Sequence, residues 1–410
     1  MISEKLQKAR EFEQEQLSKI SPEERPSFHV TGGTGWINDP NGFSFYKDEY
    51  HLFYQYHPYS NEWGPMHWGH VTSKDLITWE RLPLAMVPEE SYDNFGCFSG
   101  SGIELPDGRH LLMYTGVGYV SDIPMANGEL PTHQTQCLAV GDGTDYEKYE
   151  KNPILVDNAD WRCPGHGTLV EKDGKQYYLY HAYNRTGSVY VGRQGVLEEL
   201  FWGEDGWPYF KNDVKYDRLN TSLDFEDNFK GKTLNALWQW RVTQTIHYTT
   251  GKKGLELGAS TDNRDLGTLL VQPIKSLNFT LEATIDTRRS TSYAGIGIIG
   301  GAHNGFGAPL AGIGVSVKGG RVEVWKTVDG NSATLAESPM DISEIARIRM
   351  IVRDGYKLDF EYLNDGGWIS LAKRVDASSY VPWGMGFRIG LCAKGEDGTY
   401  ANFRKISLIH

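Results

Sequence analysis

The chain has 410 residues, of which 12% are aromatic and 23% charged, and it contains 47 glycines. Its length predicts two or three domains, and abundant aromatic and glycine residues favour short strands joined by tight turns. The formal net charge of −12, without any basic run, excludes duplex nucleic acid as a partner. No run of 18 apolar residues occurs, so we expect no membrane partner.

The N-terminus and the cysteines predict the cellular compartment. Residues 1–20 are strongly charged and lack the apolar region of a secretory signal. The four cysteines show no paired spacing, which argues against both a zinc site and a disulfide framework. We therefore expect a reduced, cytoplasmic protein.

The first predicted element is a helix over 3–19, because this stretch holds straight-chain helix formers and neither glycine nor proline. It forms most of an N-terminal segment, 1–24. From residue 28 onward the sequence changes to short strands that follow turn signals such as Pro-Asp-Gly and Lys-Asp-Gly. The clearest of these strands are 51–58, 109–117, 135–141 and 175–183.

The strands of residues 25–218 recur in units of about 40–50 residues with aromatic and glycine punctuation, which is typical of β-propeller blades. We predict an all-β fold that starts with a five-bladed-type β-propeller. The motifs account for about three blades, so the propeller is predicted to be incomplete. A β-sandwich of similar strands is the alternative.

A polar stretch at 211–222 separates this region from a second set of alternating strands, which predicts a concanavalin-like or jelly-roll β-sandwich over 222–410. The predicted strands are 281–287, 293–301, 320–328, 346–354 and 356–363. Four aromatic side chains of this domain are interpreted as core or interdomain packing: Trp325, Trp368, Trp383 and Phe387.

The most informative motif is the octapeptide Trp-Ile-Asn-Asp-Pro-Asn-Gly-Phe at 36–43. Proline fixes φ and Asn-Gly permits positive φ, so Asp39 is expected at the lip of a tight turn. A carboxylate there, with the ring of Trp36 beside it, suits a pocket that stacks a sugar and attacks its anomeric carbon. A simple surface turn is the alternative interpretation.

Further polar and aromatic side chains follow within sixty residues. Gln55 brings an amide, Trp63 and Phe98 bring ring faces, and Ser99 brings a hydroxyl. These are the groups that orient a polyhydroxylated ligand, so they favour a carbohydrate site.

These motifs, with Trp-Gly-His-Val-Thr-Ser-Lys-Asp and Phe-Ser-Gly-Ser, resemble the first two blades of glycoside hydrolase family 32, the β-fructofuranosidases, over about 25–155. The resemblance implies that Asp39 is the catalytic nucleophile. It also implies that the remaining motif side chains line the fructosyl subsite: Asn38, Gln55, Trp63, Phe98 and Ser99.

Two further motifs of that family are missing. The family continues with Arg-Asp-Pro and, a blade later, with a Glu-Cys motif that carries the general acid. The nearest residues here place Cys163 or Arg162 at those positions, and a guanidinium does not give up its proton near neutral pH. Unmatched acids of the region receive no catalytic role: Glu104, Asp122, Glu129, Asp157, Asp160, Glu198, Glu199 and Glu204.

The stretch that begins Cys-Pro-Gly-His at 163–166 is similar to the last blade of glycoside hydrolase family 43, the β-xylosidases and α-arabinofuranosidases. The region from about 223 resembles the sandwich that follows the propeller in those enzymes. By this resemblance His166 helps to hold a central structural ion, commonly calcium; a hydrogen-bonded core histidine is the alternative. No other cofactor is expected.

Both families use the first-blade aspartate, as a nucleophile in family 32 and as a general base in family 43. We expect hydrolysis of terminal β-fructofuranosides, with an oligosaccharide or a sucrose-like substrate. The alternatives are a xylosidase or arabinofuranosidase activity, and a carbohydrate-binding relative without turnover. If the chain is a hydrolase, the general acid would come from an unexpected loop, or from a second subunit in a homo-oligomer.

Overall fold

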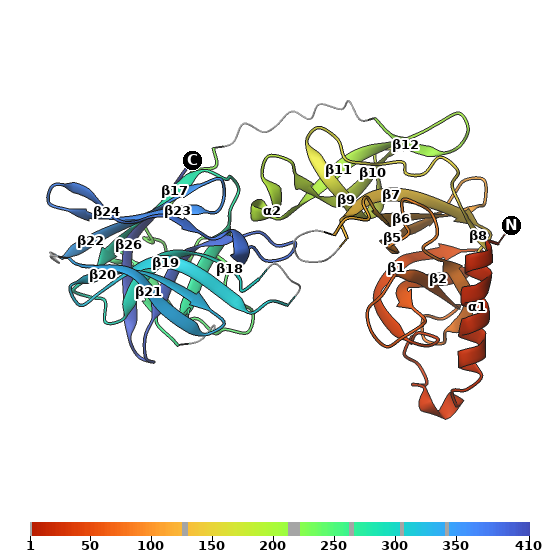
Figure 1. The fold of residues 1–410 in the computed structure, drawn as a ribbon, viewed down its shortest axis with the longest axis horizontal. Helices are drawn as coiled ribbons and strands as arrows, with labels where there is room; N and C mark the ends of the chain where they lie inside the picture. Colours follow the sequence, from red (N-terminus) through yellow and green to blue (C-terminus); the bar gives the residue numbers. More distant parts are fainter. Residues whose placement is uncertain (1, 125–129, 212–221, 262–265, 304–306, 341–343) are drawn as a thin grey trace. The chain divides into compact units, whose positions relative to one another are not determined.

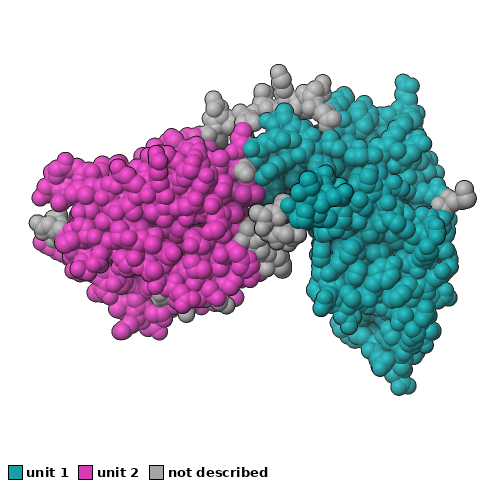
Figure 2. Space-filling view, viewed as in Figure 1, with its two compact units in different colours: residues 1–185, 194–216 teal, residues 186–193, 217–410 magenta. Residues whose placement is uncertain are grey.

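The computed structural model divides the chain into two compact units. Unit 1 comprises residues 1–185 and 194–216, and unit 2 comprises 186–193 and 217–410 (Figure 2). The predicted end of the propeller, 218, lies outside the described residues, so that boundary stays a prediction. The residues that the structure describes are 2–124, 130–211, 222–261, 266–303, 307–340 and 344–410.

Unit 1 contains three four-stranded antiparallel sheets, each made of four consecutive strands (Figure 1). Such meanders are the blades of a β-propeller, and three of them agree with the number that the sequence motifs predicted. Blade 1 is β1 (Trp36–Tyr46), β2 (Glu49–His57), β3 (His67–Ser73) and β4 (Glu80–Met86). Blade 2 is β5 (Gly96–Glu104), β6 (His110–Tyr119), β7 (Thr132–Gly141) and β8 (Tyr146–Lys148). Blade 3 is β9 (Trp161–Lys172), β10 (Lys175–Asn184), β11 (Arg193–Trp202) and β12 (Pro208–Phe210).

In blades 1 and 3, a two-residue loop joins the first strand to the second, as the turn signals predicted. Lys47 and Asp48 join β1 to β2 with φ of 49° and 62°. Asp173 and Gly174 join β9 to β10 with φ of 54° and 72°. Two successive positive φ angles define the type I′ turn, whose twist matches that of the flanking strands.

The predicted N-terminal helix is present as α1 (Glu4–Leu17), which is followed by a short 3₁₀ helix at Pro22–Glu24. Leu6 and Ala9 are buried and pack on the aromatic side chains of blade 1. Arg10 donates to the carbonyl of Leu84 at 2.8 Å. The helix therefore covers blade 1 with one narrow apolar stripe, which explains its otherwise polar sequence.

Unit 2 is a β-sandwich of an eight-stranded and a six-stranded antiparallel sheet, as predicted. It also contains α2 (Ser188–Val191) and a 3₁₀ helix at Ser378–Tyr380. The eight-stranded sheet comprises β13 (Phe225–Asp227), β14 (Tyr248–Gly251), β15 (Gly254–Gly258), β17 (Phe279–Asp286), β22 (Ile345–Arg353), β23 (Lys357–Asn364), β24 (Gly367–Asp376) and β26 (Tyr400–Ile409). The six-stranded sheet comprises β16 (Thr268–Pro273), β18 (Tyr293–Gly301), β19 (Leu310–Lys318), β20 (Arg321–Val328), β21 (Asn331–Pro339) and β25 (Arg388–Lys394).

The four aromatic residues predicted to pack in this domain have different environments. Phe387 is fully buried in the core between the sheets, as predicted. Trp383 is 45% exposed and carries the Arg193 guanidinium 4.3 Å from its ring centroid. Trp368 lies under Arg349, and Trp325 lies outside the main core. The packing interpretation is therefore confirmed for Phe387 and for Trp325, which is partly buried against a second, smaller apolar cluster of unit 2. Trp383 is exposed and does not pack in the core.

Candidate active site

Asp39 lies inside strand β1, which corrects the prediction that it sits at a tight turn. Ile37 pairs with Tyr56 and Pro40 with Tyr54, so Asn38 and Asp39 together oppose one residue of β2. This is a β-bulge, which bends the strand and redirects a side chain. The proline that suggested a turn is accommodated at the bulge, where a ladder hydrogen bond is already lost.

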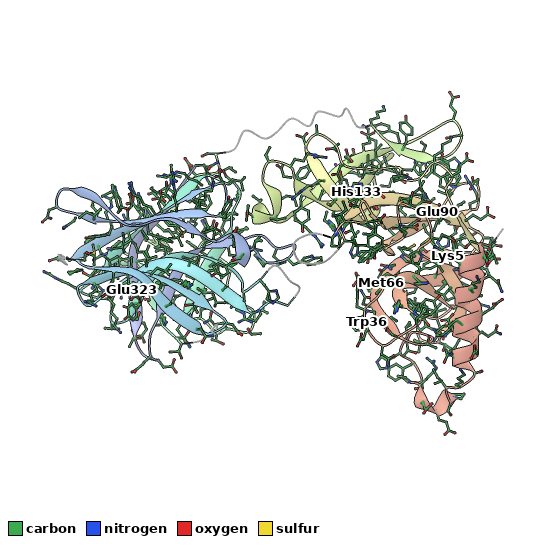
Figure 3. All side chains as sticks on the ribbon, in the orientation of Figure 1. Lys5, Trp36, Met66, Glu90, His133 and Glu323 are labelled. Carbon is green, nitrogen blue, oxygen red and sulfur yellow. The ribbon has the colours of Figure 1, made fainter. Side chains whose placement is uncertain are left out.

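The Asp39 carboxylate is partly buried and hydrogen-bonded through both oxygens. Ser99 Oγ donates to Asp39 Oδ2 at 2.8 Å, and Asn38 Nδ2 donates to Oδ1 at 3.2 Å. Trp36 Nε1 in turn donates to Asn38 Oδ1 at 2.9 Å. Four of the predicted site residues are therefore joined in one chain of hydrogen bonds, which fixes the direction of the carboxylate. Figure 3 labels Trp36 at the start of this chain.

Gln55 is buried and makes a hydrogen bond to the protein backbone. Its side chain amide donates to the Cys97 carbonyl at 2.9 Å, and only 2% of the residue is exposed. Trp68 Nε1 donates to the same carbonyl at 3.1 Å. These two donors hold strand β5 of blade 2 against blade 1, and the role of Gln55 in the fructosyl subsite stays a prediction.

Trp63 and Phe98 form an aromatic wall. Trp63 is 49% exposed, and its ring meets Phe98 edge to face with centroids 6.1 Å apart. Phe95 packs against both rings, at 5.7 and 5.9 Å. Edge-to-face packing holds a large exposed ring in place at low entropic cost, so the wall offers an apolar face to a ligand.

A buried ion pair in blade 2 was missed by the sequence interpretation. Lys148 Nζ lies 2.7 Å from Asp93 Oδ2, and the Asp93 side chain is completely buried. Asp93 also accepts from Tyr114 Oη at 2.8 Å and from the Glu90 amide at 2.8 Å. The pair anchors the segment that leads into β5, and burial raises the pKa of the neighbouring Cys97 thiol.

A second missed feature is a polar relay from Ser99 to blade 3. Thr115 Oγ1 donates to the Ser99 carbonyl at 2.9 Å and accepts from the His166 amide at 2.8 Å. Gln136 Nε2 donates to Thr115 Oγ1 at 3.0 Å and to the Pro164 carbonyl at 2.9 Å. The signal in the sequence was a threonine and a glutamine, Thr115 and Gln136, within strands that are otherwise largely apolar. The structure shows that both side chains are buried.

In blade 3, residues 162–166 lie on an irregular part of β9 that reaches Thr115 through the His166 amide. Cys163 and His166 have φ of 56° and 48°, and β9 shifts register beside them. The Cys163 amide donates to Asp157 Oδ1 at 2.8 Å, and Arg185 Nη2 lies 3.2 Å from Asp157 Oδ2. This carboxylate is therefore committed to holding the strand.

The residues at His166 do not fit a calcium site. His166 is exposed, which overturns the core-histidine interpretation, and calcium prefers oxygen ligands. Within the described ranges, no group of three histidine, cysteine or acidic side chains is close enough to share a metal ion.

Within the part of the chain that the structure describes, no second carboxyl group is hydrogen-bonded to Asp39. Among the described residues, the side chains that hydrogen-bond Asp39 are an amide and a hydroxyl. Glu198 is buried in blade 3, where Tyr180 Oη donates to it at 2.9 Å and burial raises the pKa of its carboxyl. Glu129 lies outside the described residues.

The described residues thus combine three propeller blades with a β-sandwich. Residues 29–192 match the glycosyl hydrolases family 32 N-terminal domain, which extends past the predicted limit near 155. Residues 226–408 match the beta xylosidase C-terminal concanavalin A-like domain. The propeller region therefore resembles the family 32 N-terminal domain, and the sandwich resembles the C-terminal domain of beta xylosidases, as the sequence motifs predicted.

Curated relatives match the propeller region. A sucrose-6-phosphate hydrolase from Zymomonas mobilis is 45% identical over 179 residues, which is 42% of this chain and 33% of that protein. A levanase from Bacillus subtilis is 41% identical over 144 residues, 34% of this chain and 20% of that protein. Such matches span about a third or less of the relatives' length.

Among solved structures, a xylan beta-1,4-xylosidase from Bacillus halodurans has a TM-score of 0.54 at 15% identity, covering 92% of this chain and 87% of that one. A family 43 protein from Bacillus licheniformis has a TM-score of 0.53 at 18% identity, covering 93% and 87%. These likenesses confirm the propeller-and-sandwich fold. No helix within the described ranges is long and apolar enough to cross a membrane.

Proposed function

We propose that this chain is a β-fructofuranosidase that acts on sucrose or fructan-type substrates, with Asp39 as the nucleophile. The observation that carries the proposal is the Asp39 carboxylate on the β1 bulge, held by Ser99 and Asn38, with Trp63 packed on Phe98, the residue before Ser99. The names of the relatives, a sucrose-6-phosphate hydrolase and a levanase, support a fructosyl substrate.

In the proposed reaction, the sugar lies against the Trp63–Phe98 wall and Asp39 attacks its anomeric carbon. A bond forms between a carboxylate oxygen and that carbon while the glycosidic bond breaks, and water then hydrolyses the glycosyl-enzyme. The hydrogen bonds from Ser99 and Asn38 orient the carboxylate, which is what an attacking nucleophile needs.

Protonation of the leaving group is the demanding step. Among the described residues, the side chains that hydrogen-bond Asp39 are not acids. We propose that water protonates the departing oxygen. General acid catalysis contributes about 10²–10⁴-fold to such reactions. We therefore propose slow turnover of sucrose and faster turnover of fructosides whose leaving group needs no proton.

The experiment is an activity panel on the full chain with β-fructofuranosyl fluoride, sucrose, inulin, nitrophenyl β-xyloside and nitrophenyl α-arabinofuranoside. The proposal expects release of fructose, fastest from the fluoride, and loss of this activity in Asp39→Asn. Cleavage of the pentosides alone would establish the family 43 type of activity instead. Ligand binding without any cleavage would establish a carbohydrate-binding relative.

A further inference from the structure

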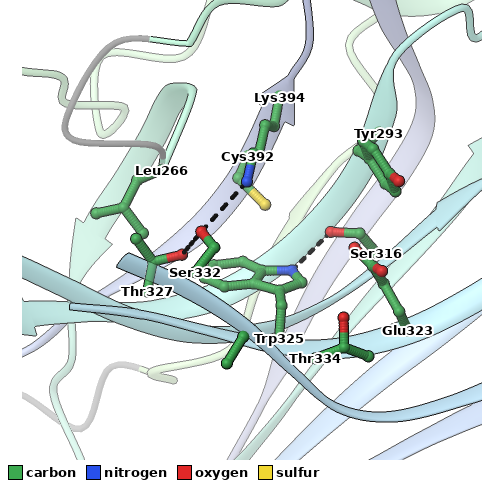
Figure 4. Close-up of a pocket in the computed structure, with 11 residues that line it drawn as sticks. Leu266, Tyr293, Ser316, Glu323, Trp325, Thr327, Ser332, Thr334, Cys392 and Lys394 are labelled. Atoms are coloured by element: carbon green, nitrogen blue, oxygen red, sulfur yellow. Dashed lines mark hydrogen bonds between the residues drawn. The ribbon is translucent and has the colours of Figure 1, made fainter. Parts of the chain in front are cut away.

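A pocket opens on the outer face of the six-stranded sheet of the sandwich, within unit 2 (Figure 4). Its volume is about 210 Å³. Strand β20 explains which side chains reach it, because Val322 and Val324 point into the sandwich core and are fully buried. Alternation along the strand then places Glu323 and Trp325 on the opposite face, where both line the pocket.

The indole of Trp325 lies flat on a floor of glycine. A Cβ atom at Gly314 would come within 2.5 Å of the Trp325 ring, and one at Gly297 within 3.3 Å. These two glycines pair across β18 and β19, directly beside Trp325 on β20. Trp325 Nε1 donates to Ser316 Oγ at 2.7 Å, which fixes the ring in the plane of the floor.

Polar groups surround this ring. Thr327 and Ser332 hydroxyls lie 2.7 Å apart, and Lys394 Nζ donates to Ser332 Oγ at 3.3 Å. Glu323 lies on the other side of the ring, so the pocket holds one carboxylate and one ammonium group. The opposite charges cancel, and apart from the Cys392 thiol and the Trp325 indole, the rest of the polar lining is hydroxyl. This chemistry suits a neutral polyhydroxylated ligand better than a phosphate or a cation.

We propose that this pocket is a carbohydrate-binding subsite in which one sugar ring of an oligosaccharide stacks on Trp325. Ligand pockets for drug-sized molecules measure roughly 300–1,000 Å³, so a pocket of about 210 Å³ accommodates a single ring with the rest of the chain outside. An amphipathic aromatic ring with fixed geometry and adjacent hydroxyls is the combination that orients a sugar. The proposal is independent of Asp39.

The test measures polysaccharide binding by the full chain carrying Asp39→Asn, which prevents turnover of the probe. Affinity electrophoresis in inulin and in arabinoxylan, with titration calorimetry against nystose and xylotetraose, distinguishes fructan from xylan as the source of the sugar. We expect one of the two to bind, and Trp325→Ala to weaken that binding at least about tenfold. Trp325→Phe should retain part of it, because a smaller ring still stacks.

A second variant keeps the test valid if Trp325→Ala fails to fold. Thr334 is exposed and pairs with Trp325 from β21, so Thr334→Arg fills the mouth of the pocket without touching the floor. It should weaken binding as well. The matched control is Trp368→Ala, which removes a tryptophan from the other sheet. Binding by Thr334→Arg at the parent level would overturn the proposal, as would binding by the parent to neither polysaccharide. The proposal would also be overturned if Trp63→Ala abolished binding while Trp325→Ala bound as tightly as the parent.

Discussion

Ser99 on the first strand of blade 2 donates a hydrogen bond to Asp39 on the first strand of blade 1, with 2.8 Å between Oγ and Oδ2. The two residues are 60 positions apart in the sequence, and the contact requires the strands to lie side by side. Gln55 and Trp68 ensure this by donating to the Cys97 carbonyl. The candidate nucleophile is thus oriented by the neighbouring blade.

Replacing Asp39 with asparagine is expected to abolish fructosyl transfer to water while leaving the fold intact. The change removes the charge and keeps the shape, so activity should fall by at least about 10³-fold. The measurement is kcat/KM for β-fructofuranosyl fluoride, with circular dichroism to confirm folding. Asp48→Asn is the matched control, because Asp48 is exposed at the end of the same strand and asparagine tolerates its positive φ. An active Asp39→Asn variant would falsify the assignment.

Ser99→Ala should reduce kcat/KM without changing stability much. A hydrogen bond to a charged group contributes about 1.5–3 kcal/mol, which corresponds to roughly 10–150-fold in rate if it acts in the transition state. Ser99→Thr keeps the hydroxyl and should recover part of the loss. Equal activity of the alanine and parent proteins would show that Ser99 does not orient Asp39.

Cleavage should depend steeply on the leaving group. Fluoride leaves without a proton, whereas the glucose of sucrose leaves as an alkoxide that must be protonated. We expect kcat to be at least about 10²-fold higher for the fluoride, measured by fructose release at neutral pH. Similar rates for the two substrates would reveal an efficient general acid elsewhere in the chain.

Breaking the buried ion pair should destabilise the propeller. Lys148→Met leaves the Asp93 carboxylate buried without its cation, which costs about 3–5 kcal/mol of unfolding free energy. Urea denaturation of the variant and parent measures the difference. Lys151→Met is the matched control, since Lys151 is exposed and only 3.4 Å from an exposed Asp205. Equal destabilisation by both variants would contradict a special role for Lys148.

Unfolding free energy should fall as pH is lowered from 7.5 to 5.5. Burial lowers the pKa of His67 to about 4 and that of His110 to about 3, and it also lowers the pKa of His51 and His70. The unfolded chain takes up protons below its histidine pKa of about 6.5, which the folded chain does not. Each such histidine removes up to about 1.4 kcal/mol per pH unit.

Two buried acids act in the opposite direction. Burial raises the pKa of Glu13 and Glu198, so their folded forms bind protons more readily than the unfolded chain does. These two acids therefore offset part of the loss of stability that the four histidines cause as pH falls. Urea denaturation at pH 7.5, 6.5 and 5.5 provides the test, and an unchanged or rising midpoint would contradict it.

Sequence reasoning predicted the hairpins and the sheets because their signals are local. Asp48 and Gly174 lie in two-residue turns with positive φ angles, which aspartate and glycine adopt more readily than most residues. The bulge at Asp39 was not predictable, because it depends on pairing with Tyr54 and Tyr56, and the adjacent proline favoured a turn. Long-range pairing decided the local geometry.

Sites that depend on two elements were equally hidden. Thr115 links blade 2 to His166 only because β9 lies beside β6 in space. Trp325 was interpreted as core or interdomain packing. Its face of the sheet, and the glycines beneath it, become evident only from the register of β18, β19 and β20.

The central claim is that Asp39 forms a covalent bond to a fructosyl unit. Mixing the full chain with β-fructofuranosyl fluoride, quenching with acid after milliseconds, and mapping peptides by mass spectrometry tests it most directly. The account predicts the mass of one fructosyl unit on the peptide that contains Asp39, and its absence in Asp39→Asn. A fructosyl unit on another residue, or rapid hydrolysis with no adduct and full activity in Asp39→Asn, would contradict it.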